Sequence, residues 1–162
     1  MSPRAALRLE TLGFRYVYDY VPGKVDWLAH GLPREGASAG RATAGDVVHH
    51  DVPRCGIDES IQTVAQRIAA SDYSFAVVLG PNDVLLGRVR KSALEDATGT
   101  VAAVMESGPS TIRPHSTIKD VARQMRNRDL RTMLVTTPEG HWLGAIRRED
   151  VEARATDARG TV

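Results

Sequence analysis

The chain contains an internal repeat that limits the folds open to it. Residues 57–94 align with residues 114–151 without a gap, at a constant offset of 57 positions. The identical pairs fall where apolar residues recur on one helix face, or where glycine and proline mark turns. These pairs are Ile61 and Ile118, Val64 and Val121, Ala65 and Ala122, Asp72 and Asp129, Val78 and Val135, Pro81 and Pro138, Gly87 and Gly144, and Arg90 and Arg147. The alignment predicts a tandem duplication whose two copies pair with each other.

Each copy is predicted to fold as helix, strand, strand and helix after a lead-in segment. In the first copy, Ser60 is a candidate N-cap for a helix over 61–68, followed by strands over 75–79 and 84–89 and a helix from 91. In the second copy, Ser116 or Thr117 caps a helix over 118–125, followed by strands over 133–135 and 141–146 and a helix over 148–155. One copy leaves an apolar sheet face that the other would bury. The predicted fold class is therefore an α+β sandwich of two such units.

Length and composition exclude several classes of protein. A chain of 162 residues can bury one sizeable core or two small ones, and its 42% hydrophobic and 25% charged residues are those of a soluble globular protein. A net charge of +1 gives no electrostatic case for a nucleic acid or an anionic membrane as partner. A single cysteine excludes an intrachain disulfide, and no apolar run approaches a membrane span or a signal peptide. We expect a cytoplasmic protein.

Residues 1–36 are predicted to form a short helix, a strand over 14–18 and a second short helix, with residues 37–42 as a flexible linker. This extension is too small to fold alone, so its aromatic side chains are expected to pack against the rest of the chain. They are Phe14, Tyr16, Tyr18, Tyr20 and Trp27.

The same extension resembles a known domain through six short motifs. The motifs SPRAA, LGF, VYDY, GK, DWL and GLP, at residues 2–6, 12–14, 17–20, 23–24, 26–28 and 31–33, look like the C-terminal part of a rhodanese domain. In that family the catalytic cysteine lies in a loop just before the position of Ser2. Cys55 stands in the repeat region and lacks the family's helix-opening arginine, so the resemblance implies no sulfurtransferase activity.

The repeated unit also resembles a known domain. An apolar strand runs through a glycine and two further strand residues into a polar turn that opens a helix, at residues 87–93 and 144–150. This unit resembles the CBS domain, and residues 43–155 resemble a CBS pair, or Bateman module. The resemblance implies CBS domains at 43–98 and 99–156, after the extension 1–36 and linker 37–42 and before a flexible tail 157–162. It also implies a homodimer formed through the helices of the pair.

The resemblance implies a ligand and a site. CBS pairs commonly bind adenosine-containing ligands such as AMP, ADP, ATP or S-adenosylmethionine between the copies, with an aspartate on the ribose. Asp150 occupies that position in the second copy, and Ala93 occupies it in the first, so one of the two clefts keeps its ribose acceptor. The family would line this cleft with Arg54, Cys55, Tyr73, Ser74, Phe75, Ala145 and Ile146. Tyr73 or Phe75 is a candidate to stack on adenine, and plain core packing is the alternative.

The family's hydroxyl residue near the phosphate is replaced by arginine in both copies, as Arg90 and Arg147. With Lys91 and Arg148 beside them, the four cations would favour ATP or ADP over AMP if they converge. Otherwise they point to solvent or pair with nearby glutamates. Asp150 likewise has an alternative role, because an acidic residue in the first turn of a helix stabilises that helix without a ligand.

Two functions from different classes follow. The first is a non-enzymatic regulatory module that requires no cofactor and signals by a change of shape when an adenine nucleotide binds. The second is a ligand-free interaction or dimerisation module whose clefts are filled by their own side chains, which Ala93 and the two arginines favour. Four histidines are candidate metal ligands but lack partners at metal-ligand spacing: His49, His50, His115 and His141. No catalytic motif stands out in the sequence.

Overall fold

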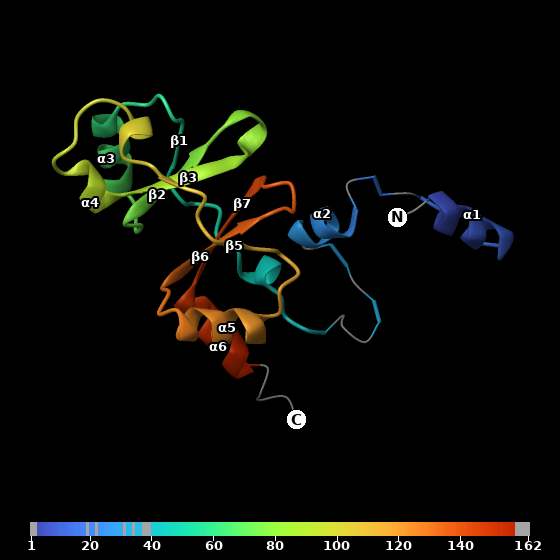
Figure 1. Ribbon diagram of the computed structural model, residues 1–162. Coiled ribbons are helices and arrows are strands. Elements are labelled where there is room, and N and C mark those ends of the chain that lie inside the picture. The colour runs from blue at the N-terminus through green and yellow to red at the C-terminus, as the bar shows by residue number, and fades with distance from the viewer. Residues whose placement is uncertain are drawn as a thin grey trace.

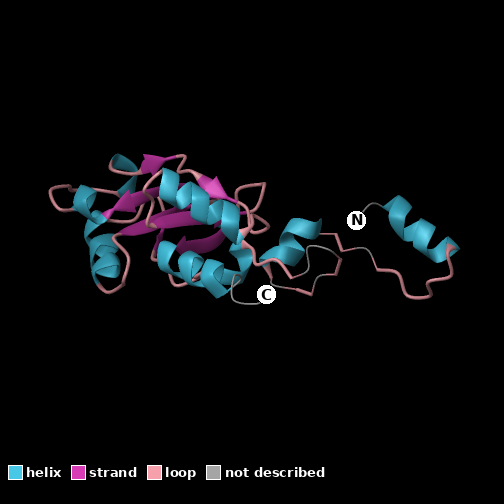
Figure 2. Cartoon of the chain, turned by 90° about the horizontal axis from the view of Figure 1, so that it is seen from below, coloured by secondary structure: helices cyan, strands magenta, loops and turns pink. Residues whose placement is uncertain are grey.

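Two small β-sheets, one for each repeat, form the centre of the molecule, with helices on their outer sides (Figure 1). The structure is a computed structural model that describes residues 3–18, 20–21, 23–30, 32–33, 35–36 and 40–157. Figure 2 shows the same molecule from below, with the strands between groups of helices and the N-terminal helix set apart from them. The predicted α+β class is confirmed by this arrangement.

The first repeat builds a four-stranded sheet in the order β1-β2-β3-β4, in which β1 and β2 are parallel and the other neighbours are antiparallel. Its elements are β1 (Arg54–Cys55), α3 (Ile61–Ala69), β2 (Phe75–Leu79), β3 (Leu85–Arg90), α4 (Lys91–Leu94) and β4 (Glu106–Ser107). A short 3-10 helix, η2 (Pro81–Asp83), joins β2 to β3. The hydroxyl of Ser60 accepts a hydrogen bond from the Thr63 backbone, so it is the N-cap that the sequence predicts for α3.

The second repeat has the same order of elements at the same offset. They are β5 (Thr111–Ile112), α5 (Ile118–Asn127), β6 (Thr132–Thr136), β7 (Trp142–Arg147) and α6 (Arg148–Asp157). Of the two candidate caps, Thr117 is the one that accepts a hydrogen bond from the backbone of α5, at Asp120. The three strands lie in the order β5-β6-β7, which mirrors β1-β2-β3. The predicted duplication therefore exists in the fold.

The lead-in segments are exchanged between the repeats. The 3-10 helix η1 (Ala44–Val47) precedes the first repeat, yet Ala44 is fully buried in the core of the second repeat. Its counterpart η3 (Val101–Ala103) places Val101 in the core of the first repeat. Backbone hydrogen bonds fix both, from Ala44 to Ser116 (2.8 Å) and from Val101 to Glu59 (3.0 Å). Each repeat is thus completed by chain that precedes the other.

A glycine at the same position of each repeat, Gly87 and Gly144, permits this exchange. After η1 the chain crosses β7, where His49 and Ala145 exchange backbone hydrogen bonds of 2.7 and 3.0 Å. A Cβ atom at Gly144 would lie 2.4 Å from the carbonyl oxygen of His49. A Cβ atom at Gly87 would lie 2.5 Å from Met105, on the segment that crosses β3. Any side chain at either position would push the crossing segment away.

A third apolar cluster joins the repeats. It buries side chains from the start of β2 and from β6 and β7, together with one residue of the lead-in to the first repeat. Its members are Val52, Tyr73, Phe75, Val77, Leu134, Trp142 and Ala145. The sequence predicts that each copy covers an apolar sheet face of the other, and this cluster is that contact.

The N-terminal extension differs from its prediction in the middle. Helices α1 (Pro3–Thr11) and α2 (Gly23–Ala29) are present, but residues 14–18 form no strand, because no neighbouring strand lies beside them to share backbone hydrogen bonds. Helix α2 contacts the pair: Leu28 is 8% exposed and its carbonyl lies over Gly45. Parts of the predicted linker 37–42 and almost all of the predicted tail 157–162 lie outside the described residues.

The aromatic side chains of the extension divide into two groups. Tyr20 and Trp27 contact each other edge to face, with ring centroids 5.1 Å apart. Phe14, Tyr16 and Tyr18 are 60%, 83% and 80% exposed, so the expectation that they pack against the rest of the chain is wrong.

Candidate ligand-binding cleft

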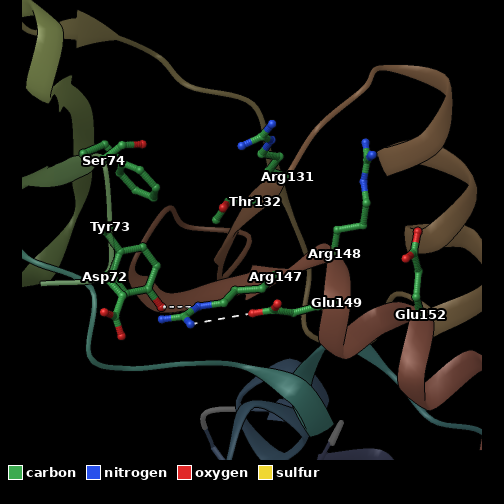
Figure 3. Close-up of a pocket in the computed structure, with 10 residues that line it drawn as sticks. Asp72, Tyr73, Ser74, Arg131, Thr132, Arg147, Arg148, Glu149 and Glu152 are labelled. Atoms are coloured by element: carbon green, nitrogen blue, oxygen red, sulfur yellow. Dashed lines mark hydrogen bonds and ion pairs between the residues drawn. The ribbon is translucent and has the colours of Figure 1, made fainter.

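A cleft of about 540 Å³ lies between the two repeats (Figure 3). The first repeat contributes the residues that lead into β2, and the second contributes the start of β6 and the junction of β7 with α6. The lining residues are Asp72, Tyr73, Ser74, Phe75, Arg131, Thr132, Arg147, Arg148, Glu149 and Glu152. Both repeats therefore line one opening.

Five of the predicted site residues line this cleft together: Tyr73, Ser74, Phe75, Arg147 and Arg148. The rings of Tyr73 and Phe75 lie edge to face, 5.7 Å apart, and are 6% and 9% exposed. They belong to the cluster between the repeats and also border the opening, so core packing and contact with the cleft are combined in the same side chains.

Ala145 and Ile146 lie behind the cleft. Both are fully buried, Ala145 in the cluster between the repeats and Ile146 in the core of the second repeat. Neither lines the opening, so they position β7 beneath it.

The prediction that Cys55 lines the cleft is wrong. Its side chain is 4% exposed in the core of the first repeat, where burial raises the pKa of the thiol to about 11. Arg54, its neighbour on β1, is exposed and donates a long hydrogen bond of 3.4 Å to the carbonyl of His50. Because β1 alternates its two side chains between core and solvent, neither reaches the cleft.

The four predicted cations do not converge. Arg90 donates a 2.7 Å hydrogen bond to Glu106, as Arg88 does, and neither Arg90 nor Lys91 lines the cleft. Their place beside Arg147 and Arg148 is taken by Arg131, which the sequence reasoning missed. Arg131 is the counterpart of Ser74 at the repeat offset, so the repeat itself contained the signal that would have found it.

Arg131 is the cation of the cleft with most freedom to meet a ligand. Its side chain is exposed, and within the part of the chain that the structure describes it has no hydrogen bond or ion pair of its own. Figure 3 shows it over the middle of the opening. Arg148, in contrast, is held by the carbonyls of Met125 (3.0 Å) and Leu130 (2.9 Å) and by the carboxylate of Asp129 (3.1 Å).

Arg147 is engaged with residues on both sides of the cleft. Its guanidinium lies 4.7 Å from the centre of the Tyr73 ring and donates a 3.4 Å hydrogen bond to the Tyr73 hydroxyl. That hydroxyl donates to Asp51 at 3.0 Å and so lowers the pKa of the Asp51 carboxyl. Arg147 also lies 3.7 Å from Glu149 and 3.8 Å from Asp51. This network joins the lead-in of the first repeat to the second repeat.

Asp150, the predicted ribose acceptor, is not among the residues that line this cleft, and its carboxylate is engaged by His49. Its Oδ2 lies 2.8 Å from Nε2 of His49, and the two side chains are 33% and 36% exposed. The crossing segment that Gly144 admits is what brings His49 to this position. In the symmetric position Ala93 offers no acceptor, and Glu106, the counterpart of His49, is bound by Arg88 and Arg90. The two symmetric positions are therefore chemically different.

Two negative findings hold for the described ranges between residues 3 and 157. No group of three or more His, Cys, Asp or Glu side chains there is placed to hold a metal ion. None of the helices described is long and apolar enough to cross a membrane.

Comparisons with known proteins agree with this fold. Residues 101–154 match the model of the CBS domain. Arabinose 5-phosphate isomerase KpsF of Escherichia coli is 29% identical over an alignment of 123 residues, and the match covers 69% of this chain and 38% of that protein. The chain thus spans about two fifths of the length of this relative.

Solved structures of CBS pairs share the fold. CBSX2 of Arabidopsis thaliana, crystallised with AMP, superposes with a TM-score of 0.64 at 18% identity, over 73% of this chain and 98% of that one. The cytosolic domain of the Mg²⁺ channel MgtE, in complex with ATP, gives a TM-score of 0.61 at 18% identity, over 69% and 48% of the two chains. The chain therefore has the fold of a CBS-domain pair, and its second repeat matches the CBS domain in sequence.

Proposed function

We propose that this chain is a non-enzymatic regulatory module that binds an adenine nucleotide in the cleft between its repeats. The observation that carries the proposal is the cleft itself, which combines aromatic residues of the first repeat with three arginines of the second. Two neighbours in fold were crystallised with AMP and with ATP, which supports an adenosine ligand here. Isomerase activity is no part of the proposal, because the chain spans 38% of KpsF.

The phosphates would lie against Arg131, Arg147 and Arg148. Guanidinium groups bind phosphate oxygens in pairs, and the N-terminus of the ten-residue helix α6 adds partial positive charge at the same wall. Three carboxylates, of Asp72, Glu149 and Glu152, border the cleft as well, so the phosphates would have to displace the arginines from these neighbours or use Arg131, which has no ion pair in the described structure. Three arginines favour ATP or ADP over AMP.

The adenosine would lie toward Tyr73 and Phe75, which line the cleft, and its ribose would reach Asp150, which follows the lining residue Glu149 on α6. A ring edge at the border of the cleft provides a surface for adenine, and the Asp150 carboxylate accepts hydrogen bonds from both ribose hydroxyls once it leaves His49. Binding therefore requires a rearrangement of the His49 contact. Because that contact joins the lead-in to the second repeat, the ligand would shift the repeats relative to each other.

A thermal-shift panel with ATP, ADP, AMP and S-adenosylmethionine tests the proposal. A ligand at 100 times its dissociation constant adds roughly 2.7 kcal/mol to the free energy of unfolding. We expect ATP and ADP to stabilise most, and Arg131→Ala to weaken ATP binding about tenfold, as expected for one phosphate contact of 1–2 kcal/mol. Arg126→Ala, an equal change of charge on the exposed face of α5, is the control. Equal stabilisation of all three proteins would overturn the assignment of the phosphate site.

A second candidate function rests on a specific observation. The cleft is partly filled by its own side chains, through the Asp51–Tyr73–Arg147 network and the His49–Asp150 pair. A cleft closed in this way fits an interaction module that needs no ligand. Absence of stabilisation by all four compounds would favour this function, and dimerisation through the helices of the pair would then be its expected mode of action.

A further inference from the structure

The contact between His49 and Asp150 stands between a nucleotide and the predicted ribose acceptor. The Nε2 atom of His49 lies 2.8 Å from Oδ2 of Asp150, and the two side chains are 36% and 33% exposed. An imidazole gains a positive charge as the pH falls from about 8 to about 5. Protonation of the ring would add an ion pair to this hydrogen bond, so the strength of the contact depends on pH.

The backbone holds His49 at this position, while its ring keeps room to turn. His49 and Ala145 exchange backbone hydrogen bonds of 2.7 and 3.0 Å, and the neighbouring Val48 packs against the core of the second repeat. The ring itself is partly exposed, so a rotation of the side chain alone can take it from Asp150 into solvent. The contact can therefore open without displacing the crossing segment.

The charged groups near His49 come from its own segment, from α6 and from β7. Asp150 on α6 makes the contact, and Asp51 lies two residues along the chain from His49. The pKa of the Asp51 carboxyl is lowered, foremost by the hydrogen bond from Tyr73 and also by the charges of Arg147 and His49. Arg147, the cation of this group, already lies 3.8 Å from Asp51. A positive charge on His49 therefore adds to the attraction of the Asp150 carboxylate.

Other charged residues beside the pair have contacts of their own. Arg148 and Glu149, which precede Asp150 on α6, line the cleft between the repeats. The Nδ1 atom of His50 lies 2.7 Å from a backbone carbonyl of β7. Asp150 is thus the carboxylate on which a proton at His49 acts.

The equivalent crossing in the first repeat carries no histidine. Glu106 occupies the position of His49, and it is held by Arg88 and Arg90 in ion pairs of 2.7 Å each. Guanidinium groups and carboxylates of ordinary pKa keep their charge between about pH 5 and pH 8. Of the two crossings, the one that reaches Asp150 is therefore the one that can respond to pH in this range.

We propose, on the basis of the function above, that protons regulate this module: a proton on His49 holds Asp150 in the contact, and nucleotide binding releases that proton to solvent. At low pH the charged ring competes with the ribose hydroxyls for the carboxylate, and at higher pH the neutral ring competes less. Proton and nucleotide thus oppose each other at one site, and nucleotide affinity rises with pH. The module would combine the nucleotide level with the pH of its surroundings.

Calorimetric titration with ATP from about pH 5 to about pH 8 tests this regulation on the natural chain and on His49→Gln. Glutamine keeps a neutral donor, so the two proteins should bind ATP alike near pH 8. Near pH 5 the natural chain should bind about threefold more weakly than His49→Gln, as expected for a partly exposed ion pair. The ratio of the two affinities at each pH removes the titration of the ATP phosphate itself, whose pKa is about 6. In buffers of different ionisation enthalpy, the natural chain should also release more protons on binding.

His50→Ala is the control, because that ring contacts a neutral carbonyl, and it should keep the pH dependence of the natural chain. Melting temperatures at each pH confirm that the proteins compared are folded. A ratio between the natural chain and His49→Gln that stays constant over the pH range would overturn the role of the proton and leave nucleotide binding intact. Absence of ATP binding at every pH would instead overturn the proposed function, and this regulation with it.

Discussion

Replacing His49 with alanine is expected to tighten nucleotide binding while lowering the stability of the ligand-free protein. In the structure His49 occupies the carboxylate that would accept the ribose hydroxyls, through the 2.8 Å contact with Asp150. A ligand must break this contact before it can use Asp150. Removing the imidazole therefore removes a competitor of the ligand and a support of the fold at the same time.

The size of the effect follows from the exposure of the pair. A hydrogen bond to a charged group contributes about 1.5–3 kcal/mol when it is well shielded. His49 and Asp150 are 36% and 33% exposed, and solvent reduces the value for such pairs to about 1 kcal/mol. We therefore expect ATP to bind about fivefold more tightly to His49→Ala, and the free energy of unfolding to fall by about 1 kcal/mol.

Calorimetric titration with ATP and urea unfolding measure the two quantities. His50→Ala is the matched control, because that imidazole contacts the carbonyl of Leu143 (2.7 Å) and leaves Asp150 untouched. Unchanged or weaker ATP binding by His49→Ala would refute the idea that His49 competes with the ligand. Weaker binding would instead make His49 a ligand contact.

Three further predictions concern the exchanged lead-ins, the buried thiol and the ion pairs of Glu106. Gly144→Ala is expected to lower the free energy of unfolding, measured in urea, by about 2–3 kcal/mol, because its Cβ would meet the carbonyl of His49. Gly99→Ala is the control and should lower it less, since Gly99 also has a positive φ but has open space around it. Cys55, with a pKa near 11, should react with iodoacetamide at pH 8 only after unfolding. Burial raises the pKa of Glu106, but hydrogen bonds from Arg88 and Arg90 outweigh it and lower the pKa overall. The stability that Glu106 contributes is thus complete above its ordinary pKa and disappears as the pH falls through the lowered one, so the melting temperatures of the natural protein and Glu106→Gln should differ at neutral pH and converge in acid.

The repeat made most of the fold predictable. An offset measured from Ile61 and Ile118 sets where every helix and strand of the second copy begins, and hydroxyl residues before those two positions are the N-caps observed. Such signals are local, because a cap and an apolar helix face depend on residues within one or two turns. The N-terminal strand failed for a related reason: Tyr16 and its neighbours have strand propensity, but a strand also needs a partner.

The site was predictable only in part. The presence of Tyr73 and Arg147 in the cleft could be predicted from their positions in the repeat. The exchange of lead-ins could not, because it depends on which copy each segment packs against, and two similar copies leave that choice open. This exchange brings His49 to Asp150. Cys55 was misplaced because a two-residue strand sends one side chain to the core. Arg131 was missed because it lies before β6, outside the turn into α6 on which the family's motif is centred.

The central claim is that one adenine nucleotide binds between the repeats with its ribose on Asp150. Calorimetric titration of the natural chain and of Asp150→Ala with ATP, ADP and AMP tests it most directly, with Asp96→Ala, an exposed aspartate of the first repeat, as a control for the lost charge. The account predicts about one site per chain, tightest for ATP or ADP, that is lost in Asp150→Ala and kept in Asp96→Ala. Binding that survives Asp150→Ala unchanged, or no heat from any of the three nucleotides, would contradict it.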